Sequence, residues 1–350
     1  MSRYLTIVYF FCKTLPLIFN LQHKAKNSTS IYTMLSLSAI SKRNVQSTKE
    51  LMSVSTATNP TVGVFVGATS GIGEHTAYAF AKYTPYPRIH IVGRNADAGS
   101  RIVSKLQTIN PNTQATFHRH DMTLISEADA LSKTLLEQEQ KVNLLFLSPG
   151  FLNITGRTET AEGIDAKLAV TYYGRWRVVK DLLPLVEKAA DKEENARVVT
   201  VLAAGSEGPV NMDDLDLKHN YSFYNFNRHT SEFNSLAVVR FAQLYPRIGF
   251  LHAAPGIVRT GIARELPWYV RMPMKPFMFF ASSPEDSAER FYYISQGSPD
   301  YRTGSHLVDS SLKSLKEKAV ERGYLTPQLQ ETVWKHTEDI FNEALAKSSK

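Results

Sequence analysis

Short apolar runs alternate with amphipathic segments along most of the chain. The runs are rich in β-branched and aromatic residues and have the length of strands, whereas the segments between them place apolar residues three or four positions apart, as on one face of a helix. The first run is Val62 to Val66, and the others are 88–93, 115–120, 142–147, 197–202, 248–253 and 304–309. Strands that alternate with helices predict an α/β fold, in which about seven parallel strands are covered by helices on both faces.

The helical segments carry their apolar residues at ordinary core spacing. They are expected at 71–82, 95–109, after residue 124, at 164–190, after residue 221, from Ser283 onward and near the carboxy terminus. In the long 164–190 segment the repeating residues are Leu168, Tyr172, Trp176, Val179 and Leu183, and in the last helix they are Val333, Trp334, Thr337, Ile340, Phe341 and Ala344. We expect the last helix to pack on the body of the protein.

A glycine-rich turn connects the first strand to the first helix. Gly67, Gly71 and Gly73 follow the strand with G-x-x-x-G-x-G spacing, and Ile72 begins the apolar face of the helix. Glycines let backbone N–H groups approach a phosphate closely, and the helix directs the positive end of its dipole at the same point. Strand, turn and helix in this order predict a site for a nucleotide pyrophosphate. The alternative is a tight turn that binds nothing.

The end of the second strand predicts which dinucleotide binds. In a dinucleotide-binding fold this position meets the adenosine ribose, and here it carries Gly93, Arg94 and Asn95 with no acidic residue. A carboxylate would accept a hydrogen bond from the free 2′-hydroxyl of NAD, whereas a guanidinium pairs with the 2′-phosphate of NADP. The sequence therefore favours NADP(H), and the alternative is that Arg94 is merely solvated.

Composition limits the classes of partner. The formal net charge is +7, but residues 1–49 hold seven basic side chains and no acidic one, so the rest of the chain is neutral. A neutral body argues against a nucleic-acid partner. The single cysteine, Cys12, excludes a disulfide framework and a cysteine metal cluster. Asp213, Asp214 and Asp216 have no histidine at ligand spacing, so we expect a solvated loop there and no metal site.

Residues 1–58 are predicted to be an extension that precedes a single domain at 59–350. Within it, residues 4–21 are apolar and about as long as a minimal membrane span, although Lys13 and Pro16 interrupt them. Three interpretations stay open: a membrane anchor, a Ser-rich organelle-targeting leader, or translation that starts at Met34. We favour the start at Met34 and a cytoplasmic protein, with membrane contact through residues 4–21 or organelle targeting as the alternative.

With Thr69 and Ser70 inside it, the glycine turn resembles the cofactor turn of short-chain dehydrogenases/reductases. A second motif agrees, because residues 254–260 (Ala-Pro-Gly-Ile-Val-Arg-Thr) match the Pro-Gly-x-x-x-Thr turn of the family. The resemblance implies a Rossmann-type doubly wound sheet, an adenine pocket at Asp121 and Met122, and a second turn that holds the nicotinamide end. The predicted cofactor-binding residues are Gly67, Thr69, Ser70, Gly71, Ile72, Gly73, Arg94, Asn95, Asp121, Met122, Ser148, Gly150, Pro255, Gly256, Val258 and Thr260.

The catalytic residues of the family are matched only in part. The family's serine falls on Ala203, its asparagine on Thr171, and its Asn-Ala-Gly on residues 148–150 (Ser-Pro-Gly). Its Tyr-x-x-x-Lys is represented by Tyr224 and Arg228. An arginine lowers the pKa of a neighbouring tyrosine, but it cannot relay a proton because it does not deprotonate in proteins.

The resemblance therefore predicts Tyr224 as the proton donor and Arg228 as its electrostatic partner. Ser206 or Thr171 would polarise the carbonyl group of the substrate. The register of the helix leaves alternatives, because Tyr221 is a further candidate for the proton donor and a shifted register would leave neither tyrosine in place.

Residues 266–290 fall where the family carries its substrate lid. The first part, 266–280, is rich in aromatic residues and methionine, which indicates a lipophilic small-molecule substrate, a packed segment, or one that touches a membrane. The resemblance is to divergent fungal members of natural-product pathways. It implies a homo-oligomeric, NADPH-dependent enzyme that interconverts a ketone and a secondary alcohol in secondary-metabolite biosynthesis. The rival interpretations are a cofactor-binding scaffold without redox turnover and a non-redox isomerase or dehydratase.

Overall fold

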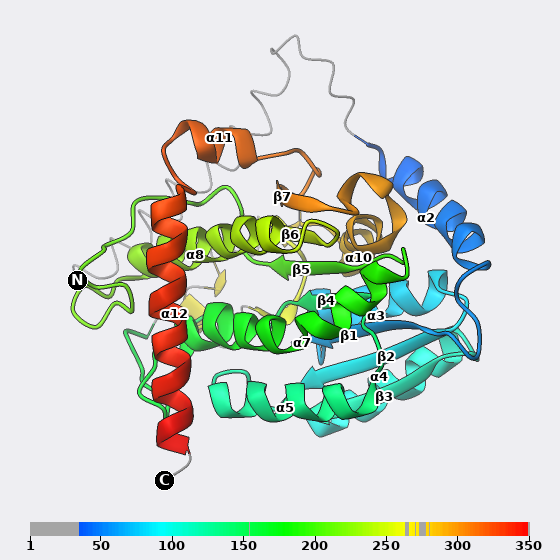
Figure 1. The fold of residues 1–350 in the computed structure, drawn as a ribbon, viewed down its shortest axis with the longest axis horizontal. Helices are drawn as coiled ribbons and strands as arrows, with labels where there is room; N and C mark the ends of the chain where they lie inside the picture. Colours follow the sequence, from blue (N-terminus) through cyan, green and yellow to red (C-terminus); the bar gives the residue numbers. More distant parts are fainter. Residues whose placement is uncertain are drawn as a thin grey trace. The chain divides into compact units, whose positions relative to one another are not determined.

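One parallel sheet forms the centre of the protein. The computed structural model describes residues 35–153, 155–262, 266–269, 271–272, 278–279 and 281–348. Within these residues seven strands pair in the order β3-β2-β1-β4-β5-β6-β7, and every pair is parallel (Figure 1). The strands are β1 (Thr61–Val66), β2 (Pro87–Gly93), β3 (Gln114–Arg119), β4 (Leu144–Leu147), β5 (Arg197–Val201), β6 (Gly249–Ala253) and β7 (Gly304–Val308). The predicted doubly wound sheet is confirmed.

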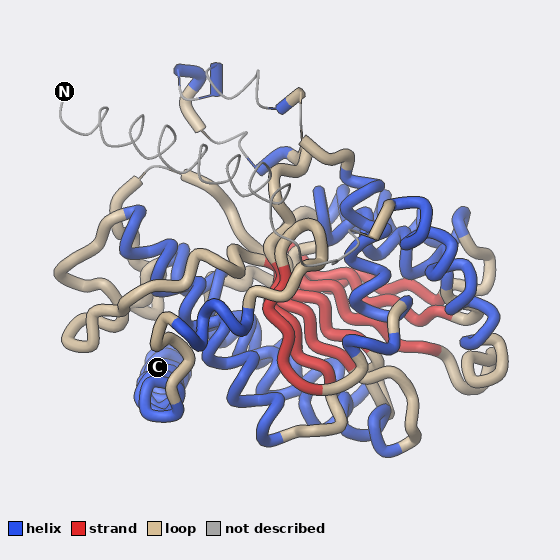
Figure 2. The backbone as a smooth tube through the Cα atoms, turned by 90° about the horizontal axis from the view of Figure 1, so that it is seen from above, coloured by secondary structure: helices blue, strands red, loops and turns tan. Residues whose placement is uncertain are grey.

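Helices cover both faces of the sheet, so that the strands lie between two groups of helices (Figure 2). One face is covered by α3 (Gly71–Tyr83), α4 (Ala96–Ile109) and α10 (Pro284–Tyr292). The other is covered by α5 (Ile125–Gln138), α7 (Gly174–Asp191) and α8 (Phe223–Leu244), with α12 (Pro327–Ser348) packed against α5 and α8. The short elements η3 (Tyr293–Gly297), η4 (Pro299–Tyr301) and α11 (Lys316–Glu321) flank β7.

The central strand β1 contributes to two hydrophobic cores, because successive side chains of a strand face opposite sides of the sheet. Val64 and Val66 lie in the core beneath α5, α7 and α8. Phe65 lies in the core beneath α3, where its ring meets that of Phe80 edge-on at 5.4 Å between centroids. Every residue of β1 is buried, which agrees with the uninterrupted apolar run in the sequence.

The order of the strands reverses between β1 and β4, and this reversal positions the site. The chain runs outward from β1 to β2 and β3, then returns to form β4 on the other side of β1. In open α/β sheets, ligands bind in the crevice that forms at such a reversal, beyond the carboxyl ends of the strands. The turn at Gly67 follows β1 and Ser148 follows β4. Two of the predicted cofactor segments therefore flank this crevice.

A helix that the pattern did not predict, α2 (Leu37–Leu51), packs beside α10. Ile40 is buried in the same core as α3, and Asn44 Nδ2 donates to the backbone oxygen and the carboxylate of Glu289 at 3.0 and 2.8 Å. The compact unit begins at Leu35. The boundary expected at residue 58 therefore does not separate α2 from the body of the protein.

Residues 1–34 lie outside the described residues, and with them the apolar stretch 4–21 and Met34. Among the helices that the structure describes, none is both long enough and apolar enough to cross a membrane. Membrane contact through residues 4–21 stays a prediction.

The long helix predicted over 164–190 is interrupted near its start. It consists of α6 (Ala166–Leu168), a π-helical turn η1 (Ala169–Tyr173) and α7. A donor from another helix lies at the π turn, since Asn234 Nδ2 of α8 donates to the carbonyl oxygen of Thr171 at 3.1 Å. Such π turns are frequent at functional sites, and this one lies just before Arg175, which is described below.

Candidate cofactor site and active site

The first glycine turn is pressed against the loop that follows β4. Gly67 has a φ of 77°, and a Cβ atom there would lie 2.3 Å from the Cα of Pro149. A Cβ atom on Gly73 would lie 2.5 Å from Ser148 Oγ and 2.9 Å from the Cα of Ala68. Side chains at these two positions would push the turn away from β4. The glycines are therefore required by the packing of the turn itself.

The same turn presents the start of α3. The helix begins at Gly71, which has a φ of 64°, and the side chain of the preceding Ser70 makes no capping hydrogen bond. The first N–H groups of a helix need acceptors from outside the helix, and an anion is a favourable one. The N–H groups at the start of α3 therefore fit the pyrophosphate of a dinucleotide. Thr69 lies against the end of β2, because a Cβ atom on Gly93 would be 2.8 Å from Thr69 Oγ1.

The early and late turns lie next to each other. A Cβ atom on Gly71 would be 3.2 Å from Cγ2 of Thr260. The late turn is fixed by backbone pairing with a later segment, because Arg259 N donates to Ser282 O at 3.0 Å and Ser282 N donates to Ile257 O at 2.9 Å. Two motifs that are far apart in the sequence thus meet beyond the carboxyl ends of the strands. The sequence predicted this meeting only through the family resemblance.

The adenosine end of the predicted site carries an exposed cation. Arg94 follows β2, its side chain is 60% exposed, and its Nη1 lies 3.6 Å from Oδ2 of Asp121 after β3. Asn95 Oδ1 accepts from Ala98 N at 2.9 Å and thereby caps α4. Met122 is buried. The structure thus gathers Arg94 and Asp121 as predicted, and it gives Asn95 a structural role that the sequence did not specify.

Tyr224 and Arg228 lie one turn apart near the start of α8. Tyr224 is half exposed, and the guanidinium carbon of Arg228 lies 4.4 Å from the centre of its ring. Arg228 also contacts the loop after β5, where a Cβ atom on Gly208 would be 3.0 Å from its guanidinium. The predicted pair therefore forms, but the cation covers the face of the ring rather than the phenol oxygen.

The alternative donor, Tyr221, has a different environment. Its hydroxyl is buried and has no hydrogen-bond partner among the described residues. Lys167 of α6 lies 5.2 Å above its ring. Burial, and to a lesser degree the charge of Asp165, raises the pKa of Tyr221 well above its ordinary value. A phenol in this setting stays protonated at neutral pH.

The two hydroxyls predicted to polarise the substrate differ in accessibility. Ser206 is exposed, and its backbone N–H donates to Ala203 O at 3.0 Å in a turn. Thr171 is buried, and its hydroxyl donates to Lys167 O at 2.6 Å. The Thr171 hydroxyl can therefore only accept a further hydrogen bond, whereas the Ser206 hydroxyl can still donate and accept. Thr171 lies next to a predicted cofactor residue, since a Cβ atom on Gly150 would be 3.9 Å from its methyl carbon.

The sequence did not reveal Arg175, which holds the loop after β4 where the family carries Asn-Ala-Gly and this chain carries Ser148. Ser148 Oγ reaches Val66 O and Gly67 O only at 3.4 and 3.5 Å. Arg175 of α7 is fully buried, and its guanidinium donates to Thr200 Oγ1 and Val201 O at 2.8 Å each and to Pro149 O. It therefore ties β5 to the loop after β4. The sequence gives little signal for it, because Arg177 follows two residues later in the same helix and both arginines read as solvated side chains.

A buried polar cluster lies beside the same strand ends. Ser235 Oγ on α8 lies 2.7 Å from Glu207 Oε1 and 2.7 Å from His252 Nδ1 on β6. Burial, with a further contribution from the charge of Arg175, lowers the pKa of His252 to about 3. Burial raises the pKa of Glu207. All three side chains are enclosed, so the cluster holds the loop after β5 and does not reach the crevice.

The carboxylates of the acidic loop at 213–216 interact with nearby residues of the same loop. Asp214 accepts backbone hydrogen bonds from His219 and Asn220 at 3.1 and 2.7 Å. Asp216 pairs with Lys218 at 2.9 Å. Within the described residues, no group of three potential ligands lies at metal-binding distance.

The predicted lid is described only in part. Trp268, Met272 and Phe279 are exposed, Phe279 at 83%, while 270, 273–277 and 280 lie outside the described residues. The last part of the predicted range belongs to α10, which packs on α3. The lid assignment therefore applies at most to residues before Pro284.

Comparison with known proteins agrees with this geometry. Residues 61–212 match the family model described as short chain dehydrogenase. Oxidoreductase AN1596 of Emericella nidulans is 32% identical over 314 residues, which cover 81% of this chain and 93% of that protein. Oxidoreductase notO of Aspergillus sp. is 30% identical over 89% of this chain and 96% of its own length. Polyprenol dehydrogenase of Mus musculus is 26% identical over 66% of this chain and 70% of its own length.

Solved structures agree on the fold. A short-chain type dehydrogenase/reductase from Mycobacterium marinum superimposes with a TM-score of 0.55 at 16% identity, over 76% of this chain and 99% of that one. An alcohol dehydrogenase from Thermococcus sibiricus, complexed with 5-hydroxy-NADP, gives 0.53 at 20% identity, over 70% and 94%. The two glycine turns, the strand order and the fungal relatives lead to one conclusion: the chain belongs to the short-chain dehydrogenase/reductase family.

Proposed function

We propose that this protein is an NADPH-dependent oxidoreductase that interconverts a ketone and a secondary alcohol on a lipophilic small molecule in secondary-metabolite biosynthesis. The observation that carries the proposal is the contact between the two turns, with Gly71 and Thr260 side by side beyond the strand ends. An extended dinucleotide that lies across this crevice would touch both turns.

The residues present fit such a cofactor. The N–H groups at the start of α3 would hold the pyrophosphate, because the side chain of Ser70 does not cap them. Arg94, exposed after β2, would pair with the 2′-phosphate, and Asp121 and Met122 would receive the adenine. Thr260 would hold the nicotinamide end.

The cofactor supplies the hydride, and the protein supplies orientation and a proton. Tyr224 would exchange that proton with the substrate oxygen, and Arg228 would hold its ring in place through the contact at 4.4 Å. Ser206 would donate a hydrogen bond to the same oxygen. Trp268, Met272 and Phe279 expose apolar area, which supports a lipophilic substrate, and one relative is named a polyprenol dehydrogenase.

Calorimetric titration with NADPH and NADH tests the cofactor. We expect NADPH to bind more tightly, and Arg94→Ala to weaken NADPH by about 10- to 100-fold, as the loss of charge-assisted hydrogen bonds predicts, while the affinity for NADH stays within about twofold. Lys105→Ala, an exposed cation on α4, is the control and should change neither. Tighter binding of NADH to the unaltered protein would contradict the NADP assignment.

A second candidate is a cofactor-binding protein without redox turnover. It is favoured by Ala203 in the serine position and by the half-exposed Tyr224. Turnover of NADPH with a panel of ketones separates the candidates. If the enzyme assignment is right, Tyr224→Phe lowers turnover by at least about 100-fold and leaves NADPH binding intact.

Tyr221→Phe is the matched variant for that test. If Tyr221→Phe loses turnover and Tyr224→Phe does not, the proton donor is Tyr221 and not Tyr224. No NADPH consumption by the unaltered protein, together with tight binding, would support the scaffold, and substrate turnover without net change in NADPH would support an isomerase or dehydratase.

A further inference from the structure

Arg175 is a buried cation without an acidic partner at the carboxyl edge of the sheet. Its three closest acceptors are Thr200 Oγ1, Val201 O and Pro149 O, and its longer contacts go to Val170 O at 3.3 Å and Leu147 O at 3.4 Å. All of these acceptors are neutral. No carboxylate in the described part of the chain forms an ion pair with it.

The guanidinium lies next to the loop that follows β4. Pro149, whose carbonyl it holds, is the residue that the turn at Gly67 is pressed against. A Cβ atom on Gly150 would lie 3.9 Å from Nη2. The other acceptor strand, β5, is the neighbour of β6, from which the late turn departs. Arg175 thus contacts the loop after β4, which carries the predicted cofactor residues Ser148 and Gly150, and is one strand away from the late turn.

The charge is retained at neutral pH and is not compensated nearby. Burial lowers the pKa of Arg175 to about 9, so the side chain is still cationic at pH 7. The titratable group on the neighbouring strand is His252, whose low pKa keeps it neutral. Glu207 is held by Ser235 and Gly205 N rather than by Arg175. A fixed positive charge in a low-dielectric region acts over a longer distance than the same charge in water.

We propose that Arg175 is a positioning residue that also sets the redox preference of the cofactor site. Its hydrogen bonds hold the loop after β4 against the first glycine turn, and its charge disfavours the positively charged oxidised nicotinamide relative to the neutral reduced ring. The site would therefore select NADPH over NADP⁺. This inference rests on the proposed function, because it assumes that a nicotinamide cofactor occupies the crevice.

The chain contains a matched control at the opposite end of β5. Arg197 is also fully buried, its pKa is also lowered to about 9, mainly by burial, and it donates to the carbonyl oxygens of Ile294 and Ser298. It differs from Arg175 in position, since it lies at the first residue of the strand, away from the crevice. A purely structural role would leave the ratio of the NADP⁺ and NADPH dissociation constants unchanged in a variant of either arginine.

The test is the ratio of the dissociation constants for NADP⁺ and NADPH, measured by calorimetry at pH 7. We expect the unaltered protein to prefer NADPH, and Arg175→Gln to lower the ratio by about tenfold, which is the order of magnitude expected when one fixed charge is removed from a medium with an effective dielectric constant of about 20. Arg175→Lys keeps the charge but cannot reach every acceptor, so both affinities should fall while the ratio persists. Arg197→Gln should lower the melting temperature and leave the ratio unchanged.

Arg175→Lys provides a second readout if Arg175→Gln does not fold. Its ratio should stay close to that of the unaltered protein while both affinities fall. An unchanged ratio in Arg175→Gln, or a ratio in Arg175→Lys that falls as far as expected for Arg175→Gln, would overturn the inference while leaving the proposed function intact. An equal change in Arg197→Gln would also overturn it. Absence of binding by either cofactor to the unaltered protein would instead remove the proposed function, and the inference with it.

Discussion

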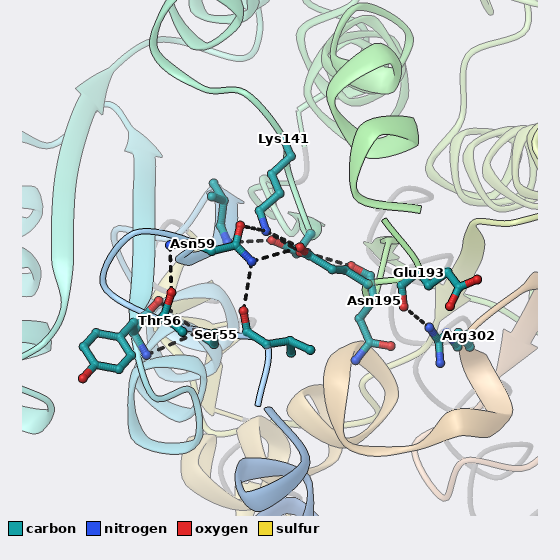
Figure 3. A network of polar contacts seen from close by, with 12 residues as sticks. Ser55, Thr56, Asn59, Lys141, Glu193, Asn195 and Arg302 are labelled. Atoms are coloured by element: carbon teal, nitrogen blue, oxygen red, sulfur yellow. Dashed lines mark hydrogen bonds and ion pairs between the residues drawn. The ribbon is translucent and has the colours of Figure 1, made fainter. Parts of the chain in front are cut away.

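The two edges of the sheet carry different buried charged groups: an ion pair lies where the strands begin (the amino edge), and Arg175 lies where they end (the carboxyl edge). At the amino edge, Lys141 and Glu194 form a buried ion pair, and Asn59 and Asn143 complete it with hydrogen bonds to Glu194 at 3.2 and 2.8 Å. Figure 3 shows Lys141 and Asn59 converging there, with Arg302 bonded to Glu193 O nearby. Burial alone would raise the pKa of Glu194, but the hydrogen bonds from Lys141, Asn143 and Asn59 outweigh it and hold the pKa below its ordinary value.

At the carboxyl edge, several buried polar groups have no such partner. Glu232 of α8 is fully buried, its Oε1 accepts from Leu325 N at 3.3 Å, and its Oε2 has no partner among the described residues. His252 Nε2 is also without one, and Arg175 has no acid. Unsatisfied buried groups cost stability, and the amino edge holds some as well, because Arg197 Nε has no partner among the described residues. The difference between the edges therefore lies in the ion pair, which stabilises the fold at the amino edge, whereas we expect the carboxyl edge to hold the cofactor.

Substitution of one glycine at each edge should give the largest difference between an effect on NADPH binding and an effect on stability. A Cβ atom on Gly73 would lie 2.5 Å from Ser148 Oγ, and one on Gly249, at the start of β6, would lie 2.2 Å from Tyr301 O. We expect Gly73→Ala to weaken NADPH binding by at least about 100-fold, because the turn must move away from β4. Gly249→Ala should cost about 1 to 3 kcal/mol of unfolding free energy and leave binding unchanged. Equal loss of binding in both variants would break the comparison.

Removing one partner of the amino-edge ion pair should be the next largest effect. Glu194→Ala leaves the ammonium of Lys141 buried without its counter-ion, which costs about 3 kcal/mol. Denaturant unfolding measures this loss, and NADPH affinity should stay within about twofold. The neighbouring Glu193 is exposed and contributes only its carbonyl oxygen to Arg302, so Glu193→Ala is the control. A parallel loss of NADPH affinity in Glu194→Ala would show that the two edges are coupled.

Substitution of Glu232 should have the smallest effect on stability, and it should stabilise the protein where the variants above destabilise it. Burial, aided by the charge of Glu207, raises its pKa to about 8 despite the backbone bond from Leu325. The folded state therefore keeps a proton that the unfolded state releases above its ordinary pKa, and stability is lost as the pH rises from about 4.5 through about 8. Glu232→Gln removes this cost and should stabilise the protein by about 2 kcal/mol at pH 8. The gain should vanish near pH 4.5, and a gain that does not depend on pH would contradict the assignment.

The sheet was predictable because strand burial leaves a local pattern. The residues of β1 form an unbroken apolar run, and the glycines that follow are needed for backbone contacts that any sequence with this turn must make. The helix α2 was missed because only Ile40, Asn44, Ser47 and Leu51 are buried, and two of these are polar. Asn44 is buried because it bonds to Glu289, which lies far away in the sequence.

The site was predictable only in its cofactor half. Arg94 and Asp121 follow strand ends, so their proximity follows from the order of strands β2 and β3. The contact between Gly71 and Thr260 depends on tertiary structure and was available only through the resemblance. Arg175 was missed because an arginine on a helix is expected to face solvent when only the spacing of apolar residues is considered. Its partners are a threonine and a carbonyl oxygen on β5 and a carbonyl oxygen in the loop after β4, and contacts with distant segments leave no local pattern in the sequence.

The position of β1 inside the sheet has a consequence for synthesis of the chain. This strand is the first to emerge from the ribosome, yet its neighbour β4 is separated from it by two other strands, and the last strand, β7, ends only at Val308. At about 5 to 20 residues per second, the edge of β1 that pairs with β4 would stay unpaired for on the order of 4 to 16 s, and the edges of later strands would be exposed in turn until β7 is made. Parallel pairing over such long separations is slow, so the nascent protein is expected to depend on chaperones while it is being made.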